Sequence, residues 1–347
     1  MLSDRELKSA LISKALALGA GAAGVCAADP ASEEGGGAAF ADWLARGFND
    51  GMDWLARSPD RRADLRAWFP EARSVLMLAF PWGAPEAPAP GGPPSGRFAR
   101  YATLPDYHDE LRGRLDSLRA WYAEEAAPGG KARPFVDTSP VLERLYARRS
   151  GLGWVGKNAM LISERLGCRF FLAGLALDRE LEPDAPSAER CGECRRCLDA
   201  CPTSAFAAPR VLDAARCVAC WTVERRSVPF PEEVERGLGA RVFGCDECVE
   251  ACPFNRAAPA GALSPRLAAA LPLDELLRLD EAAFAARFTG TPVLRAGLPA
   301  LLRNALAAAG NSGARELLPT VEALAAHADP LVAGQARRSA ARLAGNP

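Results

Sequence analysis

The sequence predicts a multidomain α/β plus α protein, and three observations carry that prediction. Over residues 1–185, apolar runs of strand length alternate with helical stretches, as in a mixed α/β domain. Residues 186–256 hold most of the cysteines. Residues 257–347 are rich in Ala and Leu at helical spacing. A chain of 347 residues is long enough for two or three such domains.

The first domain is predicted from two continuous apolar runs, Ser74–Phe80 and Arg169–Leu177, which suit buried strands. We expect a third, short strand at Phe135–Asp137, ending in a polar turn. Between the strands, two stretches are predicted to be helical: 40–56 and 109–125. The segment Gly83–Gly96 is rich in Pro and Gly and is predicted to be a loop.

The middle segment carries cysteines at a specific spacing. A run C-x2-C-x2-C-x3-C-P begins at Cys191 and ends at Cys201 and Pro202, which is the spacing of bacterial ferredoxins. A truncated second run begins at Cys245 and ends at Cys252. Because the last cysteine of a ferredoxin run binds the other cluster, we expect the two runs to share ligands. The predicted ligands of a first 4Fe-4S cluster are Cys191, Cys194, Cys197 and Cys252.

The second cluster takes Cys201, Cys245 and Cys248, and it needs one more thiolate. The chain between the two runs offers Cys217 or Cys220, and we favour Cys217. Zinc also binds C-x2-C pairs, but three thiols within seven residues and paired Cys-Pro ends fit zinc poorly. We expect the clusters to replace a hydrophobic core in residues 186–256. Cys26 and Cys168 lie in apolar segments and are predicted to be plain buried thiols.

The predicted helical domain contains two helix starts. They are Thr291-Pro292 and Asp329-Pro330, each an N-cap residue followed by proline at the first helical position. Apolar residues then recur at helical spacing, including Leu298, Leu301 and Leu302. Short antiparallel helices of this kind predict a HEAT-like domain.

Composition limits the class of protein. The net charge is −1 and the sequence pI about 6.3, so global charge does not indicate a nucleic-acid binder. No apolar run reaches the length of a membrane span. Eleven cysteines without an export signal favour a reducing cytoplasm, where clustered cysteines bind metal.

The residues alone leave the partner cofactor open. No G-x-G-x-x-G follows a predicted strand, so no nicotinamide or flavin fingerprint is present. Asp106-Tyr107-His108 begins like the histidine motif that binds cobalamin, D-x-H-x-x-G, but Leu111 stands where glycine belongs. Two readings remain: a ferredoxin-type redox enzyme with another cofactor, or an electron-transfer ferredoxin on a larger scaffold.

Further segments, in the same order along the chain, make the sequence similar to the epoxyqueuosine reductase family. They are MDWLAR ending at Arg57, YATLPDYHDEL from Tyr101, VDTSPVLER from Val136, GLGWVGKNAMLI from Gly151, the cysteine array, and RAGLPALLRNALAAAGNS from Arg295.

The resemblance implies a cobalamin-binding domain at 1–185, a double 4Fe-4S ferredoxin-like domain at 186–256 and a HEAT-like tRNA-binding tail at 257–347. It implies reduction of epoxyqueuosine in tRNA to queuosine, with electrons passing from a low-potential donor through the clusters and cobalamin. An alternative is a cytosolic relative of the cobalamin-dependent reductive dehalogenases.

The resemblance also implies roles for single residues. Asp137 matches the family's proton donor, and a buried carboxylic acid can keep its proton near neutral pH; alternatively, Asp137 caps a helix over Val141–Arg149. The glycines around Trp154 could form a mere turn, Trp154 could fill core, and His108 could be a satisfied core histidine. The predicted cofactor-pocket residues are Arg57, Tyr101, His108, Asp137, Arg144, Trp154, Lys157, Asn158 and Met160.

The tail has ten arginines against seven acidic residues between Arg256 and Arg342. On charge alone this is an ordinary solvated helix face. The resemblance instead implies phosphate contacts to tRNA, with the following candidates: Arg295, Arg303, Arg337 and Arg338. The sequence departs from the family at Cys220, where an aromatic residue is expected.

Overall fold

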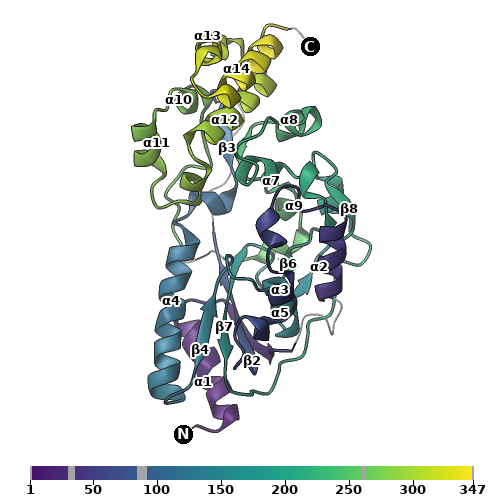
Figure 1. Ribbon diagram of the computed structural model, residues 1–347, viewed down its shortest axis with the longest axis vertical. Helices are drawn as coiled ribbons and strands as arrows, with labels where there is room; N and C mark the ends of the chain where they lie inside the picture. The colour runs from purple at the N-terminus through teal and green to yellow at the C-terminus, as the bar shows by residue number, and fades with distance from the viewer. Residues whose placement is uncertain (1, 30–35, 84–91, 260, 262, 346–347) are drawn as a thin grey trace.

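The structure is a computed structural model that describes residues 2–29, 36–83, 92–259, 261 and 263–345. The molecule is elongated, with a sheet and its flanking helices at the N-terminal end and a group of helices at the other end (Figure 1). Within the described ranges, no helix is both long and apolar enough to cross a membrane.

A four-stranded antiparallel sheet forms the N-terminal end, in the order β1-β2-β7-β4. Its strands are β1 (Ala22–Ala27), β2 (Ser74–Pro81), β4 (Ala132–Phe135) and β7 (Phe170–Leu177). Both predicted apolar runs are strands, and they pair with each other in the centre of the sheet. Alternate β2 side chains enter two separate cores, Met77 on one face and Leu76 on the other, which explains the unbroken apolar run. The third predicted strand is displaced, because β4 ends at Phe135.

Helices cover both faces of this sheet (Figure 1). Helices α1 (Asp4–Ala17) and α4 (Tyr107–Trp121) share a core with one face, and α5 (Glu143–Arg149) shares a core with the other. Helices α2 (Gly36–Ala45) and α3 (Pro59–Ala63) lie on the α5 side. The prediction of a helix over 40–56 is wrong beyond Ala45, because Gly47 adopts φ +69° and ends the helix.

Three glycines, Gly19, Gly21 and Gly24, have G-x-G-x-x-G spacing in the connection from α1 into β1. A dinucleotide-binding loop requires the opposite order, strand then helix. A side chain at Gly24 would also collide with the Ser150 carbonyl, at 2.1 Å from the added Cβ. Gly24 therefore serves close packing of the backbone, and Gly19 and Gly21 leave room for neighbouring side chains.

The cysteine segment and the stretch 154–162 before it are built from short elements. They are β5 (Trp154–Val155), β6 (Leu161–Ile162), α6 (Arg196–Asp199), β8 (Phe206–Ala208), β9 (Val211–Leu212), α7 (Val218–Val223), α8 (Glu232–Leu238), β10 (Arg241–Phe243) and α9 (Glu247–Glu250). The expectation that clusters replace a hydrophobic core is wrong for its second half. Val218, Trp221 and Val242 are buried in the same core as the tail helices, since α7, α8 and β10 pack against them.

A second sheet joins the three predicted domains. Its central strand β3 (Ser95–Phe98) pairs in parallel with β10 and antiparallel with β11 (Ala270–Pro272). The predicted loop Gly83–Gly96 is therefore wrong at its end, where Ser95 begins β3, and its residues 84–91 lie outside the described ranges. The boundaries predicted at 185 and 256 remain predictions, and one hydrophobic core crosses both.

The tail consists of α10 (Leu273–Leu277), α11 (Glu281–Phe288), α12 (Leu298–Ser312), α13 (Leu318–Ala323) and α14 (Pro330–Leu343). The predicted apolar stripe of α12 is buried, and Asp329 caps α14 as expected. The other predicted helix start is different: Pro292–Ala296 is a 3-10 helix, and the Thr291 hydroxyl donates to the Phe288 carbonyl instead of capping it.

Candidate active site

A cavity of about 880 Å³ lies beside α2, α3 and α5. Its walls combine aromatic, basic and acidic side chains, and cavities of this size with a few polar groups are typical of cofactor and substrate pockets. The aromatic and charged lining residues are Phe40, Trp43, Trp54, Trp154, Arg62, Arg144, Arg148, Arg210, Asp42, Asp137, Glu143 and Glu189.

Backbone strain gathers at this cavity. Among the described residues, five that are not glycine have positive φ, and three of them line the cavity. They are Asp137 at 49°, Ala159 at 59° and Arg210 at 72°. Such conformations cost of order 1–3 kcal/mol each and concentrate at functional sites. The cavity is therefore the candidate active site.

Asp137 lies in the turn between β4 and α5 and faces the cavity, with 54% of its side chain exposed. It does not cap the following helix, which begins at Glu143 after Leu142. The helix-cap alternative is therefore wrong. The contact runs in the reverse direction: the Asp137 backbone N–H donates to Glu143 Oε1 at 2.6 Å.

The Asp137 carboxylate belongs to a hydrogen-bonded group at the start of α4. His108 Nε2 lies 2.8 Å from Asp137 Oδ2, and His108 Nδ1 lies 2.9 Å from Asp106 Oδ1. Tyr107 donates its hydroxyl to Asp137 Oδ2 at 3.0 Å. Arg295, from the tail, donates to Asp106 Oδ2 at 2.6 Å. His108 is buried, but as part of this group rather than as an isolated core histidine.

The two carboxyl groups of the turn have opposite pKa shifts. Burial raises the pKa of Asp137, but hydrogen bonds from His108 and Tyr107 and the charge of Arg295 outweigh it, so the pKa is lowered. Burial and the nearby charge of Asp137 raise the pKa of Glu143 to about 8. The lowered pKa favours the ionised form of Asp137 in this structure, and its role as proton donor stays a prediction. The sequence prediction missed Glu143, because its contact with Asp137 spans six residues and matches no helix-capping pattern.

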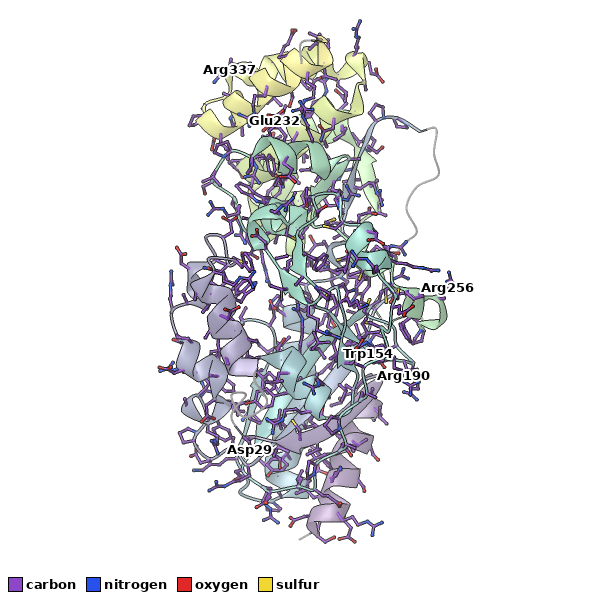
Figure 2. All side chains as sticks on the ribbon, turned by 90° about the vertical axis from the view of Figure 1, so that its right-hand side faces the viewer. Asp29, Trp154, Arg190, Glu232, Arg256 and Arg337 are labelled. Atoms are coloured by element: carbon purple, nitrogen blue, oxygen red, sulfur yellow. The ribbon has the colours of Figure 1, made fainter. Side chains whose placement is uncertain are left out.

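Trp154 connects the cavity to the cysteine segment. It lines the cavity, is 2% exposed, and its indole Nε1 donates to Cys191 Sγ at 3.4 Å. Figure 2 shows it in the middle of the molecule, close to Arg190 at the entry to the first cysteine run. Phe254 packs edge-on against its ring, with the centroids 4.9 Å apart. Trp154 is thus both a core residue and a cavity wall.

Three other predicted pocket residues contact the cysteine segment rather than the cavity. Lys157 Nζ donates to the Gly192 carbonyl at 2.5 Å, and Asn158 Nδ2 donates to the Cys248 carbonyl at 3.1 Å. Met160 packs in the cluster of side chains that contains Trp154 and Cys252. Their contacts do not test the predicted binding to a corrin ring.

The remaining predicted pocket residues are divided. Arg144 lines the cavity. Arg57 is exposed after the 3-10 helix Asp53–Leu55 and is not among the lining residues. Tyr101 is half-buried and packs edge-on against Tyr107, 6.4 Å between centroids, so it lies behind the Asp137 group.

The thiols fall into two sets according to the charges that raise their pKa values. Besides burial, the thiols that raise the pKa of Cys197 are Cys191, Cys252 and Cys194. Besides burial, the thiols that raise the pKa of Cys248 are Cys245, Cys217 and Cys201, with Cys197 of the first set contributing least. Apart from that contribution of Cys197, the two groups of thiols match the predicted ligand sets of the two clusters. The assignment remains a prediction, now supported by proximity.

Cys220 lies outside both sets. Burial raises its pKa to about 12, and Cys217 is the one thiol whose charge contributes. The backbone N–H groups of Ala219 and Cys220 point to the Cys217 sulfur, as is usual for a cluster ligand. This geometry favours Cys217 over Cys220. Cys26 and Cys168 are buried as predicted, and Cys168 contacts Cys252, a predicted ligand.

The predicted tRNA-binding arginines also divide. Arg303 is fully buried, and its guanidinium donates to the carbonyls of Trp221, Arg225 and Val228. It cannot contact phosphate, and that prediction is wrong. Arg337 is exposed at the far end of the molecule (Figure 2), and Arg338 pairs with Glu235.

Two family models match the chain: "4Fe-4S double cluster binding domain" over residues 190–255 and "Epoxyqueuosine reductase QueG, DUF1730" over residues 62–138. An epoxyqueuosine reductase of Shewanella oneidensis is 34% identical over 325 residues, which cover 90% of this chain and 82% of the relative. This chain belongs to the epoxyqueuosine reductase family. An epoxyqueuosine reductase of Xanthomonas campestris is 42% identical over 230 residues, 65% of this chain and 64% of that relative, slightly under two thirds of its length.

Solved epoxyqueuosine reductases share the fold over almost the whole chain. One, a crystal structure with a tRNA-Tyr epoxyqueuosine-modified stem loop, has a TM-score of 0.89 and 27% identity, covering 98% of this chain and 91% of that one. A Bacillus subtilis epoxyqueuosine reductase has a TM-score of 0.84 at the same identity and coverage. In that structure an aspartate catalytic loop is swung out of the active site.

Proposed function

We propose that this protein reduces epoxyqueuosine in tRNA to queuosine. The reaction removes the epoxide oxygen as water and leaves an alkene, so each turnover consumes two electrons and two protons. One observation carries the proposal: a single cavity is lined by Asp137, bonded to His108, and by Trp154, bonded to Cys191. A proton source and an electron path therefore meet at one site. The relative solved with an epoxyqueuosine-modified stem loop supports the choice of substrate.

The two thiol sets suit two 4Fe-4S clusters, each of which requires four thiolates. The proposed ligands are Cys191, Cys194, Cys197 and Cys252 for cluster 1, and Cys201, Cys217, Cys245 and Cys248 for cluster 2. Donors to sulfur, such as Ala205 N–H to Cys201 Sγ at 3.2 Å, would stabilise bound thiolates and tune the potential. Two one-electron carriers suit a two-electron reduction, supplied by a low-potential donor.

The cavity fits cobalamin, the cofactor that the family implies. Its volume and aromatic walls suit a large ring, and the buried Arg62 presents an Nε that has no hydrogen-bond partner among the described residues. Arg144 and Trp154 would contact the cofactor. Bound cobalamin supplies a strongly reducing cobalt centre. Both ring nitrogens of His108 already face carboxylates, so His108 is not available as a cobalt ligand.

The Asp137 group can hold and deliver one proton. Each His108 nitrogen faces a carboxylate oxygen, and an ionised carboxylate can only accept a hydrogen bond. Arg295 also points N–H groups at the ring, with Nη2 2.9 Å from Nδ1 and Nη1 3.3 Å from Nε2. The hydrogen between His108 Nε2 and Asp137 Oδ2 is the proposed source of the proton that reaches the epoxide oxygen through Asp137, and Arg295 stabilises the carboxylates.

The remaining parts of the chain complete the proposal. Residues 1–185 would bind cobalamin, residues 186–256 the clusters, and the HEAT-like tail would help bind tRNA, whose modified base must be flipped into the cavity. Of the predicted phosphate-binding arginines, Arg337 is exposed and has no carboxylate partner among the described residues, so it is the candidate for a tRNA contact in the tail. The protein would act in the cytoplasm. The dehalogenase alternative is not favoured, because similarity to epoxyqueuosine reductases covers 98% of the chain.

The test is an anaerobic assay of the holoenzyme, loaded with both clusters and cobalamin and supplied with a strong chemical reductant. Epoxyqueuosine-containing tRNA is converted to queuosine tRNA, detected by mass spectrometry of the digested nucleosides. Omitting cobalamin abolishes conversion. A fully loaded enzyme that leaves the epoxide intact would refute the proposed function.

A further inference from the structure

Asp137 has an uncommon backbone conformation. Its φ of +49° is in the left-handed region, which favours glycine and which aspartate adopts more readily than most other residues. Its carboxylate is bound from one side by His108 and Tyr107, which belong to α4. Those contacts fix the side chain. In the backbone of the turn, the Thr138 N–H donates to the Val136 carbonyl at 2.6 Å, and the Asp137 N–H still needs an acceptor.

Glu143 supplies that contact. Its Oε1 accepts the Asp137 backbone N–H at 2.6 Å, six residues along the chain. Glu143 itself is anchored, because it lies in the first turn of α5, whose Tyr146 and Ala147 are fully buried against the sheet. The Asp137 turn is thereby attached to a rigid helix that packs on the sheet.

The charges around Glu143 suit this task. Arg62, from α3, and Arg144, from α5, lie close enough to act on its carboxyl group, and Asp137 is the acidic neighbour. Arg62 is 8% exposed, stacks over Trp54 at 5.3 Å, and acts electrostatically on both Glu143 and Asp137. The two carboxyl groups can therefore remain close together in the cavity wall.

We propose that Glu143 is the positioning residue of the active site: by accepting the Asp137 N–H, its carboxyl group holds the Asp137 turn in the cavity. This inference rests on the proposed function for its catalytic consequence. The contact itself is independent of cofactor and substrate. Without the acceptor, the turn relaxes out of the left-handed conformation and Asp137 leaves His108.

Hydrogen exchange tests the contact in the chain without cofactors. In Glu143→Ala the Asp137 amide exchanges roughly tenfold faster or more, the factor expected for a lost hydrogen bond. Glu143→Gln keeps an acceptor oxygen and retains most of the protection. The matched control is Glu232→Ala, an exposed first-turn glutamate of α8 (Figure 2), which leaves Asp137 exchange unchanged. Unchanged exchange in Glu143→Ala, in a folded protein with a normal melting transition, overturns the proposal.

Turnover of the loaded enzyme tests the consequence. Glu143→Ala lowers kcat roughly tenfold with KM for tRNA unchanged, and Glu143→Gln restores most of it. Burial and the charge of Asp137 raise the pKa of Glu143 to about 8, so a pH-dependent step near 8 appears in the wild type and disappears in Glu143→Gln. If the wild type makes no queuosine, the proposed function fails, while the exchange result still decides the role of Glu143. Full kcat in Glu143→Ala contradicts the positioning role.

Discussion

The cavity wall around Asp137 and the buried joint around Arg303, where Arg303 binds the carbonyls of the cysteine segment, place charged groups in opposite environments. In the wall, Arg295 is 41% exposed; its Nη2 donates to Asp106 Oδ2 and lies 2.9 Å from His108 Nδ1. In the joint, Arg303 is fully buried and donates to backbone carbonyls and to Asn304 Oδ1. Both arginines come from the same stretch of the tail. One segment of the tail, residues 295–303, therefore contacts the Asp137 group through Arg295 and binds the cysteine segment through Arg303.

The pKa shifts agree with this division. In the wall, the pKa of Asp137 is lowered and that of Glu143 is raised to about 8, so protons can be held and moved near neutral pH. In the joint, burial lowers the pKa of Arg303 to about 10, which leaves it charged at neutral pH. We therefore expect changes in the wall to affect turnover and changes in the joint to affect folding.

The largest expected effect is in the wall. Asp137→Asn removes the group that passes the proton, and we expect turnover to fall by roughly 10²–10⁴-fold. Cobalamin absorption, cluster content and the unfolding transition stay close to those of the wild type, because the amide oxygen of the variant can still accept from His108 and Tyr107. The control is Asp116→Asn, an exposed carboxylate on the same helix as His108. Wild-type turnover in Asp137→Asn would show that Asp137 does not pass a proton to the substrate.

The joint is tested by Arg303→Ala. The change leaves the carbonyls of Trp221, Arg225 and Val228 buried without their donor, so we expect a loss of roughly 3–5 kcal/mol in the free energy of unfolding. Chemical denaturation measures the free energy of unfolding. The control is Arg337→Ala, which removes an exposed side chain of α14. A loss no greater than that of the control would show that the joint does not fasten the tail.

A third test separates the two cysteines next to the joint. We expect Cys217→Ser to lose one of two clusters, so that iron per chain falls by about half, and Cys220→Ser to keep both. Iron analysis and electron paramagnetic resonance of the reduced protein measure the result. Cluster loss in Cys220→Ser with full iron in Cys217→Ser would show that Cys220, not Cys217, is the fourth ligand of cluster 2.

Local patterns predicted much of this molecule. The β2 and β7 strands follow from unbroken apolar runs, the double-cluster segment from ferredoxin spacing, and α12 from its stripe of leucines. These features depend on neighbours along the chain or on a fixed spacing, which a sequence displays directly.

Contacts between distant segments were not predictable in the same way. The sequence alone suggests that Arg303 is a surface arginine. The carbonyls that accept its hydrogen bonds lie 75 to 82 residues earlier in the chain. Ser95 follows a Pro-rich segment, yet it begins the strand that joins β10 and β11. Glu143 is close to Asp137 in sequence, but their contact depends on the left-handed turn, which no residue pattern specifies.

The central claim is that electrons entering the thiol region and a proton held in the wall meet on a tRNA epoxide. The most direct measurement counts queuosine formed against electrons consumed in the fully loaded enzyme, with epoxyqueuosine tRNA in excess. The account predicts one queuosine for every two electrons. Electron consumption without queuosine, or full cluster and cobalamin content with no reaction at all, would contradict it.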